Sequence, residues 1–243
     1  MRYGIISDVH SNVDALQAVL SEIDAWNAQV LVCLGDIVGY GPDPNECCDL
    51  LRDRRVLAIL GNHDEAAVRD EGLERFNGLA REALNWTQSQ LTAANHDFLA
   101  SLPNERRFPR FSAVHGAPLR HFDYICDALD AQRAFECVDS SITFIGHTHA
   151  AEVFYQDEAR RTYHQKLRQG GRVAIAPGYR YIINAGSVGQ PRDLNPQASF
   201  AVFDDADDAT EIRRIGYDSQ PVRERMQRAN LPAELSSRLV IGC

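Results

Sequence analysis

The segment Tyr3-Gly4-Ile5-Ile6-Ser7-Asp8-Val9-His10 contains a short apolar run that ends in a carboxylate and, two residues later, an imidazole. Residues two apart in extended backbone point to the same side, so Asp8 and His10 are expected to face one site. Four more apolar runs end in polar side chains of similar kinds. They lead into Gly35-Asp36, Gly61-Asn62-His63-Asp64, His115-Gly116 and Gly146-His147-Thr148-His149. Because ligands bind at the carboxyl ends of strands in open α/β sheets, these five strand ends predict one binding site.

The residue types at these strand ends are typical of a metal site. They comprise two carboxylates, one amide and four imidazoles: Asp8, Asp36, Asn62, His10, His115, His147 and His149. This mixture suits Mn²⁺, Fe²⁺, Zn²⁺ or Co²⁺ better than Ca²⁺, whereas a structural zinc site needs only four ligands. One histidine at a strand end is more often an ordinary hydrogen-bonded residue, and one Gly-Asp pair is usually a turn. Five such strand ends together are hard to explain as turns and caps.

The order of apolar patterns predicts a partly parallel sheet. Strands are expected at 3–7, 30–34 and 56–60, and a helical stripe runs from Val13 to Trp26. A second helix is expected to begin at Asp43-Pro44-Asn45-Glu46, with Asp43 as its N-cap. Strands that alternate with helices at this spacing imply right-handed crossovers between parallel strands.

Beyond residue 64 the patterns change. Residues 65–102 are predicted to be helical, and a final helix is expected over 218–230. Short strands are predicted between them, at 106–108, 112–114, 142–145, 153–155, 161–164, 173–176, 181–183, 200–203 and 212–215. The acidic residues Asp204, Asp205, Asp207 and Asp208 fit a solvated hairpin turn; metal binding there is the weaker reading, because the EF-hand spacing is absent. Without a repeat, a low-complexity linker or a break in composition, residues 1–243 are expected to form a single domain.

Composition excludes several classes of function. The chain has 25 Lys and Arg against 34 Asp and Glu, so its formal charge is 25 − 34 = −9. A chain this acidic repels long nucleic acids and anionic membranes, although a small anionic substrate remains compatible with local positive charge. Apolar runs stay well below the roughly 18 residues that a membrane span needs, and the six cysteines lack CxxC spacing. We therefore expect a cytoplasmic protein without disulfides.

In order and separation, the five motifs resemble those of the calcineurin-like metallophosphoesterase superfamily. The stretches Gly35-Asp36-Ile37-Val38-Gly39-Tyr40-Gly41-Pro42 and Asn184-Ala185-Gly186-Ser187-Val188-Gly189-Gln190-Pro191-Arg192 are similar to its compact bacterial subgroup, labelled YfcE-like or diadenosine-tetraphosphatase-like. The resemblance implies an α/β (α+β) fold, a four-layer αββα sandwich of two mixed β-sheets flanked by helices. It also implies a dinuclear metal site at the rim where the strands end.

Position by position, the resemblance implies a role for each motif residue. One ion would be held by Asp8, His10, Asp36 and His149, and the other by Asp36, Asn62, His115 and His147. Asp36 would bridge two divalent ions, with Mn²⁺ favoured and Fe, Zn, Co or Ni as alternatives. His63 would stand near the leaving group as general acid, and Asp64 would orient it.

Two departures argue against a protein phosphatase. Ser/Thr phosphatases and the larger symmetrical dinucleotide hydrolases carry Arg-Gly shortly after the Gly-Asp motif, where this chain has Gly39-Tyr40-Gly41. They also carry Glu after Asn-His, where this chain has Asp64. Tyr40 and Arg192 are candidate substrate contacts, with loop packing as the alternative role for both. The backbone amides of residues 186–189 are a further candidate contact for an anion.

These features predict a phosphoester hydrolase, a phosphodiesterase or phosphatase in which a metal-bridging hydroxide attacks phosphorus in line. Its expected partner is a small phosphorylated, nucleotide-like substrate, with dinucleoside polyphosphates among the candidates. The alternatives are a broad phosphomonoesterase that includes phosphoprotein phosphatase activity, a non-catalytic scaffold, and a metal-storage or sensor protein, which would leave His63 without a role. Sequence leaves open the leaving group, which depends on loops 65–110, 116–140 and 156–180, and the oligomeric state.

Overall fold

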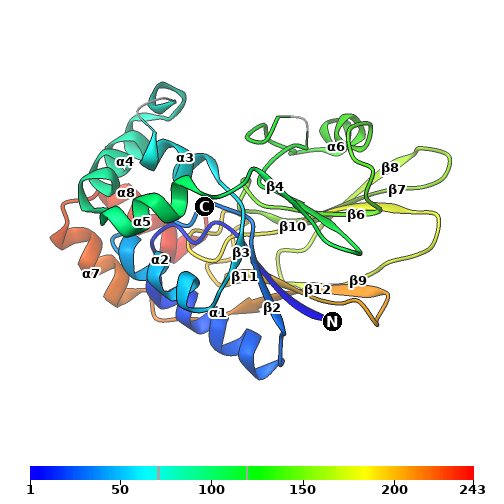
Figure 1. Cartoon of the computed structure of the whole chain (residues 1–243), viewed down its shortest axis with the longest axis horizontal. Helices are drawn as coiled ribbons and strands as arrows, with labels where there is room; N and C mark the ends of the chain where they lie inside the picture. Colours follow the sequence, from blue (N-terminus) through cyan, green and yellow to red (C-terminus); the bar gives the residue numbers. More distant parts are fainter. Residues whose placement is uncertain (70–71, 119) are drawn as a thin grey trace.

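Two mixed sheets of six strands face each other in the computed structural model, which describes residues 1–69, 72–118 and 120–243 (Figure 1). The first sheet has the order β3 (Leu57–Ala58), β2 (Val30–Cys33), β1 (Arg2–Ile6), β11 (Ala198–Asp204), β12 (Ala209–Ile215) and β9 (Gly171–Ala174). The second sheet has the order β4 (Glu105–Arg107), β5 (Ser112–Val114), β6 (Ile142–Ile145), β10 (Arg180–Ala185), β7 (Ala151–Gln156) and β8 (Thr162–Lys166). The predicted pair of mixed sheets is confirmed.

Each sheet contains a run of three parallel strands. In the first sheet β1, β2 and β3 are parallel, and in the second β5, β6 and β10 are parallel. Parallel strands bring their carboxyl ends to the same edge of a sheet, which is where a binding site forms in such folds. All five motifs follow one of these strands, so strand direction alone gathers them.

Helices cover both outer faces of the sandwich. The helices that pack on the first sheet are α1 (Val13–Ala25), α2 (Pro44–Asp53), α3 (Asn62–Val68), α4 (Gly78–Gln90) and α5 (Ala93–Ala100). A short 3₁₀ helix, Leu73–Arg75, precedes α4. The second sheet is covered by α6 (Ala128–Phe135) (Figure 1). Ala131, Ala134 and Phe135 of this helix belong to one buried apolar cluster with residues of that sheet. The result is the expected order of four layers.

Two more helices close the chain and pack away from the sheets. They are α7 (Gln220–Arg228) and α8 (Ala233–Ile241), whose buried side chains contact α4 and Tyr40. The sequence predicted α7 but neither α6 nor α8. Every helix within the described residues is too short or too polar to cross a lipid bilayer.

The helical stretch predicted over 65–102 differs in detail. It begins three residues earlier, because the Asp64 carboxylate accepts a hydrogen bond from the Gly61 amide at the N-terminus of α3. Asn62 and His63 therefore lie in the first turn of a helix. Residues 70 and 71 of the predicted stretch lie outside the described residues.

Helix α2 begins at Pro44 with Asp43 as its N-cap residue, as predicted, but the Asp43 side chain does not cap the helix. Its carboxylate accepts hydrogen bonds from Nε and Nη2 of Arg225, at 2.7 and 2.8 Å, and no cap hydrogen bond is formed. Arg225 also pairs with Asp14 of α1. A guanidinium that donates two hydrogen bonds to a carboxylate is a stronger partner than a backbone amide. Arg225 therefore links α7 to α1 and α2 through Asp14 and Asp43.

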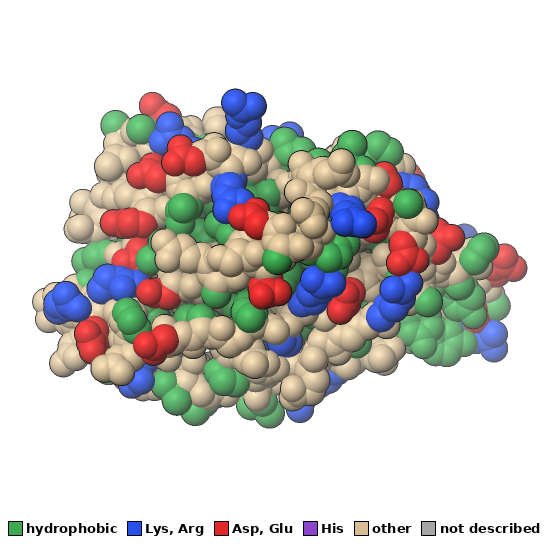
Figure 2. Space-filling view, turned by 90° about the horizontal axis from the view of Figure 1, so that it is seen from below, with side chains coloured by type: hydrophobic (Ala, Val, Ile, Leu, Met, Phe, Trp, Pro, Cys, Tyr) green, Lys and Arg blue, Asp and Glu red, His purple; other side chains and the backbone are tan. Residues whose placement is uncertain are grey.

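The acidic residues 204–208 form the hairpin turn between β11 and β12, as predicted. Their carboxylates pair with arginines from other segments: Arg2 with Asp204, Arg172 with Asp207 and Arg110 with Asp208. Basic and acidic side chains are likewise interspersed on the face shown in Figure 2. These pairs account for the acidic turn without a metal ion.

Aromatic side chains fill the space between the two sheets. Phe111 meets Phe144 and Phe203 edge to face, with ring centroids 5.2 and 5.6 Å apart. All three rings are buried, and Tyr3 lies 5.0 Å from Phe111. This interdigitation holds the strand ends of both sheets at a fixed separation.

Phe203→Ala is expected to lower the free energy of unfolding by about 3–5 kcal/mol, because it leaves a cavity between the sheets. Urea denaturation followed by circular dichroism measures the change. Leu129→Ala on α6 is the control: Leu129 is 55% exposed, so its truncation should change stability by no more than about 0.5 kcal/mol. Equal effects of the two substitutions would contradict this description of the core.

Candidate metal centre

Two groups of buried ligands meet where the strands end. The first ligand group is Asp8, His10, Asp36 and His149, and the second is Asp36, His115 and His147. Within each group the ligand atoms lie within 4.8 Å of one another. Asn62 adds an amide to the second group, since its Oδ1 lies 3.1 Å from Nε2 of His115. All seven residues predicted as ligands are thus brought together, and Asp36 belongs to both groups.

Backbone carbonyls fix the orientation of all four imidazoles. The contacts are His10 Nδ1 to Val38 O at 3.1 Å, His115 Nδ1 to Leu34 O at 2.7 Å, His147 Nε2 to Phe122 O at 2.9 Å and His149 Nδ1 to Gln190 O at 2.6 Å. A carbonyl only accepts, so each of these nitrogens carries the hydrogen. The other nitrogen, Nε2 of His10, His115 and His149, faces the carboxylates of the ligand groups. Such outer contacts are typical of histidines that bind metals.

Two of the imidazole lone pairs face each other directly. Nε2 of His10 lies 3.0 Å from Nε2 of His149, and burial lowers the pKa of both rings well below the usual range. Both rings are therefore neutral, and neither has a hydrogen to place between the two nitrogens. A shared cation removes this repulsion, and two nitrogen ligands of one ion lie at about this separation.

The Asp36 carboxylate lies between the two groups. Its Oδ1 accepts a hydrogen bond from the His63 amide at 2.8 Å. Its Oδ2 lies 3.6 Å from Nε2 of His10 and 3.3 Å from Nε2 of His115, and it is buried without a hydrogen-bond partner among the described residues. A buried carboxylate oxygen without a partner is costly. Two cations, one in each group, would both reach this carboxylate.

Burial controls the charges of the remaining ligands. It raises the pKa of Asp8 to about 7 and lowers the pKa of His147 to about 3. Burial also opposes a charge on His115, but the adjacent Asp36 carboxylate raises the pKa of that ring to about 9. The protein thus keeps three of the four imidazoles neutral, which is the ligating form, whereas His115 must release its proton when a cation binds beside Asp36. The residues present therefore fit a pair of divalent cations.

The backbone turns sharply to present these ligands. Asp8, His10, Asp36, His147 and His149 all have positive φ, between 48° and 68°. Non-glycine residues seldom adopt this conformation, and it persists where surrounding structure enforces it, most often at functional sites. A Cβ at Gly61 would clash with the Asp36 carboxylate, which explains why glycine precedes Asn62. Strain and close approach both concentrate at the ligand groups.

His63 lies beside the ligands without being one of them. Its ring centroid is 4.8 Å from that of His10 and 4.4 Å from that of Tyr40. Its Nδ1 is buried without a partner among the described residues, and burial lowers the pKa of the ring to about 4. Asp64 does not touch the ring: its carboxylate accepts hydrogen bonds from the Val38 and Gly61 amides. Any orientation of His63 by Asp64 is therefore exerted through the backbone of the turn.

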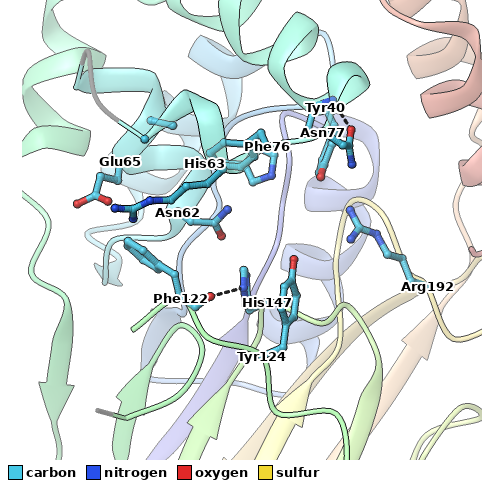
Figure 3. Close-up of a pocket in the computed structure, with 14 residues that line it drawn as sticks. Tyr40, Asn62, His63, Glu65, Phe76, Asn77, Phe122, Tyr124, His147 and Arg192 are labelled. Carbon is cyan, nitrogen blue, oxygen red and sulfur yellow. Dashed lines mark hydrogen bonds between the residues drawn. The ribbon is translucent and has the colours of Figure 1, made fainter. Parts of the chain in front are cut away.

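A cavity of about 190 Å³ opens beside the second ligand group (Figure 3). Asn62, His63 and His147 line it, together with Tyr40 and Arg192. Arg192 Cζ lies 5.4 Å from the Tyr40 ring centroid, and its Nη2 donates to Gln190 Oε1 at 2.9 Å. The Arg192 Nε is buried and has no partner among the described residues. Both predicted substrate contacts thus lie at one cavity with the ligands.

Sequence reasoning missed three aromatic residues of this cavity. Phe76, Phe122 and Tyr124 also line it (Figure 3). They lie within the loops 65–110 and 116–140, which were expected to shape the leaving-group site but whose course the sequence did not give. A local signal exists only for Phe122 and Tyr124, which follow the His115-Gly116 motif by a few residues.

The expected use of the amides of residues 186–189 for an anion is wrong. The Val188 and Gly189 amides donate to the carbonyls of Ser7 and Asp8, both at 2.9 Å, and the Gly186 amide donates to Asn184. Asn184 also donates to the Gly146 carbonyl at 2.7 Å. The segment after β10 therefore joins the ends of β1 and β6 and supports the ligands from behind.

Two facing mixed sheets with buried aspartate and histidine ligands at one edge define the metallophosphoesterase class, and this chain has both features. A sequence model described as the calcineurin-like phosphoesterase superfamily domain matches residues 1–208. The chain belongs to this superfamily, and it is a phosphoester hydrolase of the metallophosphoesterase family.

Several relatives match nearly the whole chain. Uncharacterized protein MJ0912 of Methanocaldococcus jannaschii is 35% identical over 249 residues, which cover 98% of this chain and 97% of the relative. The crystal structure of a metallophosphoesterase from Sphaerobacter thermophilus matches with a TM-score of 0.88 and 39% identity, over 100% and 99% of the two chains. Hypothetical protein PH1004 from Pyrococcus horikoshii OT3 shares the fold, with a TM-score of 0.82 and 17% identity over 100% and 98%. Yfce from E. coli and a candidate diadenosine tetraphosphatase are more distant neighbours.

Asp36→Asn is expected to reduce bound Mn²⁺ from two ions per chain to one or none, because the shared carboxylate loses its charge. Calorimetric titration and metal analysis measure the stoichiometry. In the parent protein, Mn²⁺ at 100 times its dissociation constant should raise the melting temperature by about 5–10 °C. Glu152→Gln is the matched control, because Glu152 is a buried acid that pairs with His164 outside both ligand groups. Two ions retained by Asp36→Asn would contradict the bridging position.

Proposed function

We propose that this phosphoesterase hydrolyses small, nucleotide-like phosphoesters with two divalent metal ions, Mn²⁺ in first place and Fe, Zn, Co or Ni as alternatives. The observation that carries the proposal is the Asp36 carboxylate, which both ligand groups share and whose Oδ2 has no partner among the described residues. The first ligand group would hold one ion. Asp36, Asn62, His115 and His147 would hold the other. Bound in this way, the ions supply Lewis acidity and an activated water for in-line attack on phosphorus.

The charge balance supports a small anionic substrate. Asp8 and Asp36 contribute two negative charges against four positive charges from two divalent ions, so the loaded centre is positive. The chain as a whole carries a formal charge of −9. A positive centre in an acidic protein attracts small phosphates locally, while the outer surface repels long polyanions.

Arg192 is the proposed phosphate contact of the chain itself. Its guanidinium lies at the cavity, beside the second ligand group. Arginine pairs well with phosphate because its donors match the spacing of the oxygens. The guanidinium lies over the face of the Tyr40 ring, in a cation–π contact.

His63 is the proposed general acid. Its ring lies in the cavity wall next to the ligands, and its amide donates a hydrogen bond to Asp36. Burial keeps the free ring neutral at pH 7. An anionic phosphate beside a buried imidazole favours the protonated form, so substrate binding would load the proton that the leaving oxygen receives. General acids of this kind contribute about 10²–10⁴ in rate.

His63→Ala is expected to lower kcat by about 10²–10⁴ on substrates with alkoxide leaving groups and far less on p-nitrophenyl esters, whose leaving group needs no proton. Steady-state kinetics on the Mn²⁺-loaded protein measure both, and metal analysis should still find two ions. His96→Ala is the control, since His96 is exposed on α5. Equal losses on both substrate types would remove the general-acid assignment.

A substrate panel distinguishes the remaining functions. We expect turnover of a nucleotide phosphodiester or a dinucleoside polyphosphate to exceed that of simple monoesters. Broad monoesterase activity, including a phosphoprotein, would favour the first alternative. A protein that binds two ions and turns over none of these substrates would be a scaffold.

A further inference from the structure

Tyr124 presents an unusually open aromatic surface to the cavity. One face of its ring stacks on the ligand His147, with ring centroids 4.0 Å apart and planes 15° apart. Yet 53% of the residue remains exposed, and it lines the cavity (Figure 3). A large ring that is held rigidly from one side and left uncovered elsewhere is typical of a binding surface.

Two phenylalanines complete the aromatic surroundings. Phe76 packs edge to face against the proposed general acid His63, with ring centroids 4.8 Å apart. Phe122 lines the same cavity, and its carbonyl accepts the hydrogen bond of His147. These two residues and Tyr124 are therefore each attached to a residue of the proposed reaction site. Their positions relative to the ligands are fixed.

The size and polarity of the cavity restrict what it can hold. At about 190 Å³ it is smaller than the roughly 300–1,000 Å³ of typical small-molecule pockets. The cavity is partly open to solvent, so a small planar group could enter it from outside. Arg75 and Asn77 stand among its lining residues, and Arg75 is 72% exposed. Polar groups beside aromatic walls suit a planar ring that has hydrogen-bonding edges.

We propose that Phe76, Phe122 and Tyr124 form an aromatic subsite that binds a planar aromatic ring of the substrate, a nucleobase or an aryl group, beside the second ligand group. The inference rests on the proposed function, because it names the substrate class that this site would select. Stacking on an aromatic side chain depends on the planar face of the ring and tolerates differences in its edge. The subsite would therefore discriminate between planar and non-planar rings more strongly than between different nucleobases.

The test measures binding as well as turnover. Calorimetric affinities, which need no turnover, are determined for two matched pairs of phosphates on the Mn²⁺-loaded protein. Phenyl phosphate against cyclohexyl phosphate tests planarity at nearly constant size. Adenosine 5′-monophosphate against ribose 5-phosphate tests whether a nucleobase supplies the ring. We expect the aromatic member of each pair to bind about 5- to 100-fold more tightly, in line with one stacked ring.

Tyr124→Leu should abolish most of this difference while leaving the affinity for cyclohexyl phosphate and ribose 5-phosphate unchanged. Tyr124→Phe should retain the difference, since it keeps the ring. Tyr163→Leu, on the edge strand β8, is the control for loss of an exposed tyrosine. Metal content should remain at two ions in all variants, because the Phe122 carbonyl still orients His147.

Equal affinity within both pairs for the parent protein would overturn the subsite. A Tyr124→Leu variant that loses affinity for all four compounds alike would also overturn it, because Tyr124 would then act only through His147. A preference confined to phenyl phosphate would support an aryl ring and contradict a nucleobase. Failure of the proposed function is distinguishable: it would appear as absent turnover, whereas the affinity differences are measured without turnover.

Discussion

The structure around the ligand groups must offset the cost of burying ionisable side chains at the edge of the two sheets. Asp8, Asp36 and the ligand imidazoles are almost fully removed from water, which disfavours the ionised form of each. At Asp36 one carboxylate oxygen is left without a partner, and at His10 and His149 two lone pairs face each other. Protonated His115 lies 3.3 Å from the Asp36 oxygen without a well-aligned hydrogen bond, and neither neutral ring of the His10–His149 pair has a hydrogen to share. Cations satisfy these acceptors, and this is why the ligand groups are a metal centre and not a polar core.

The rest of the fold holds these groups together against their mutual repulsion. Three parallel strands in each sheet bring the ligand-bearing ends to one edge, and the aromatic layer around Phe111 fixes the distance between the sheets. Carbonyls orient each imidazole, and the segment from Asn184 ties β1 to β6. Positive φ angles at five ligands cost stability, which the large buried apolar clusters must offset. Function and local strain therefore occupy the same residues.

Much of this could be predicted from the sequence because it depends on short-range patterns. Apolar runs that end in Asp8, Asp36 or His147 predict both the strands and the convergence of their ends. The N-cap position of Asp43 was predicted correctly, but the partner of its carboxylate, Arg225, was not, because Arg225 is distant in the sequence. The aromatic residues of the cavity, such as Tyr124, were missed for a similar reason: the course of their loops is set by tertiary packing. Sequence patterns thus identify the ligands better than the surfaces that select a substrate.

The central claim is that one carboxylate, Asp36, joins two cations. Crystals grown with Mn²⁺ and measured at the manganese absorption edge test it directly, because anomalous difference density locates each ion independently of the phases of the protein. We predict two peaks about 3.5–4 Å apart, both within bonding distance of Asp36, one beside His149 and the other beside His147. A single peak, or two peaks that Asp36 does not join, would contradict the account.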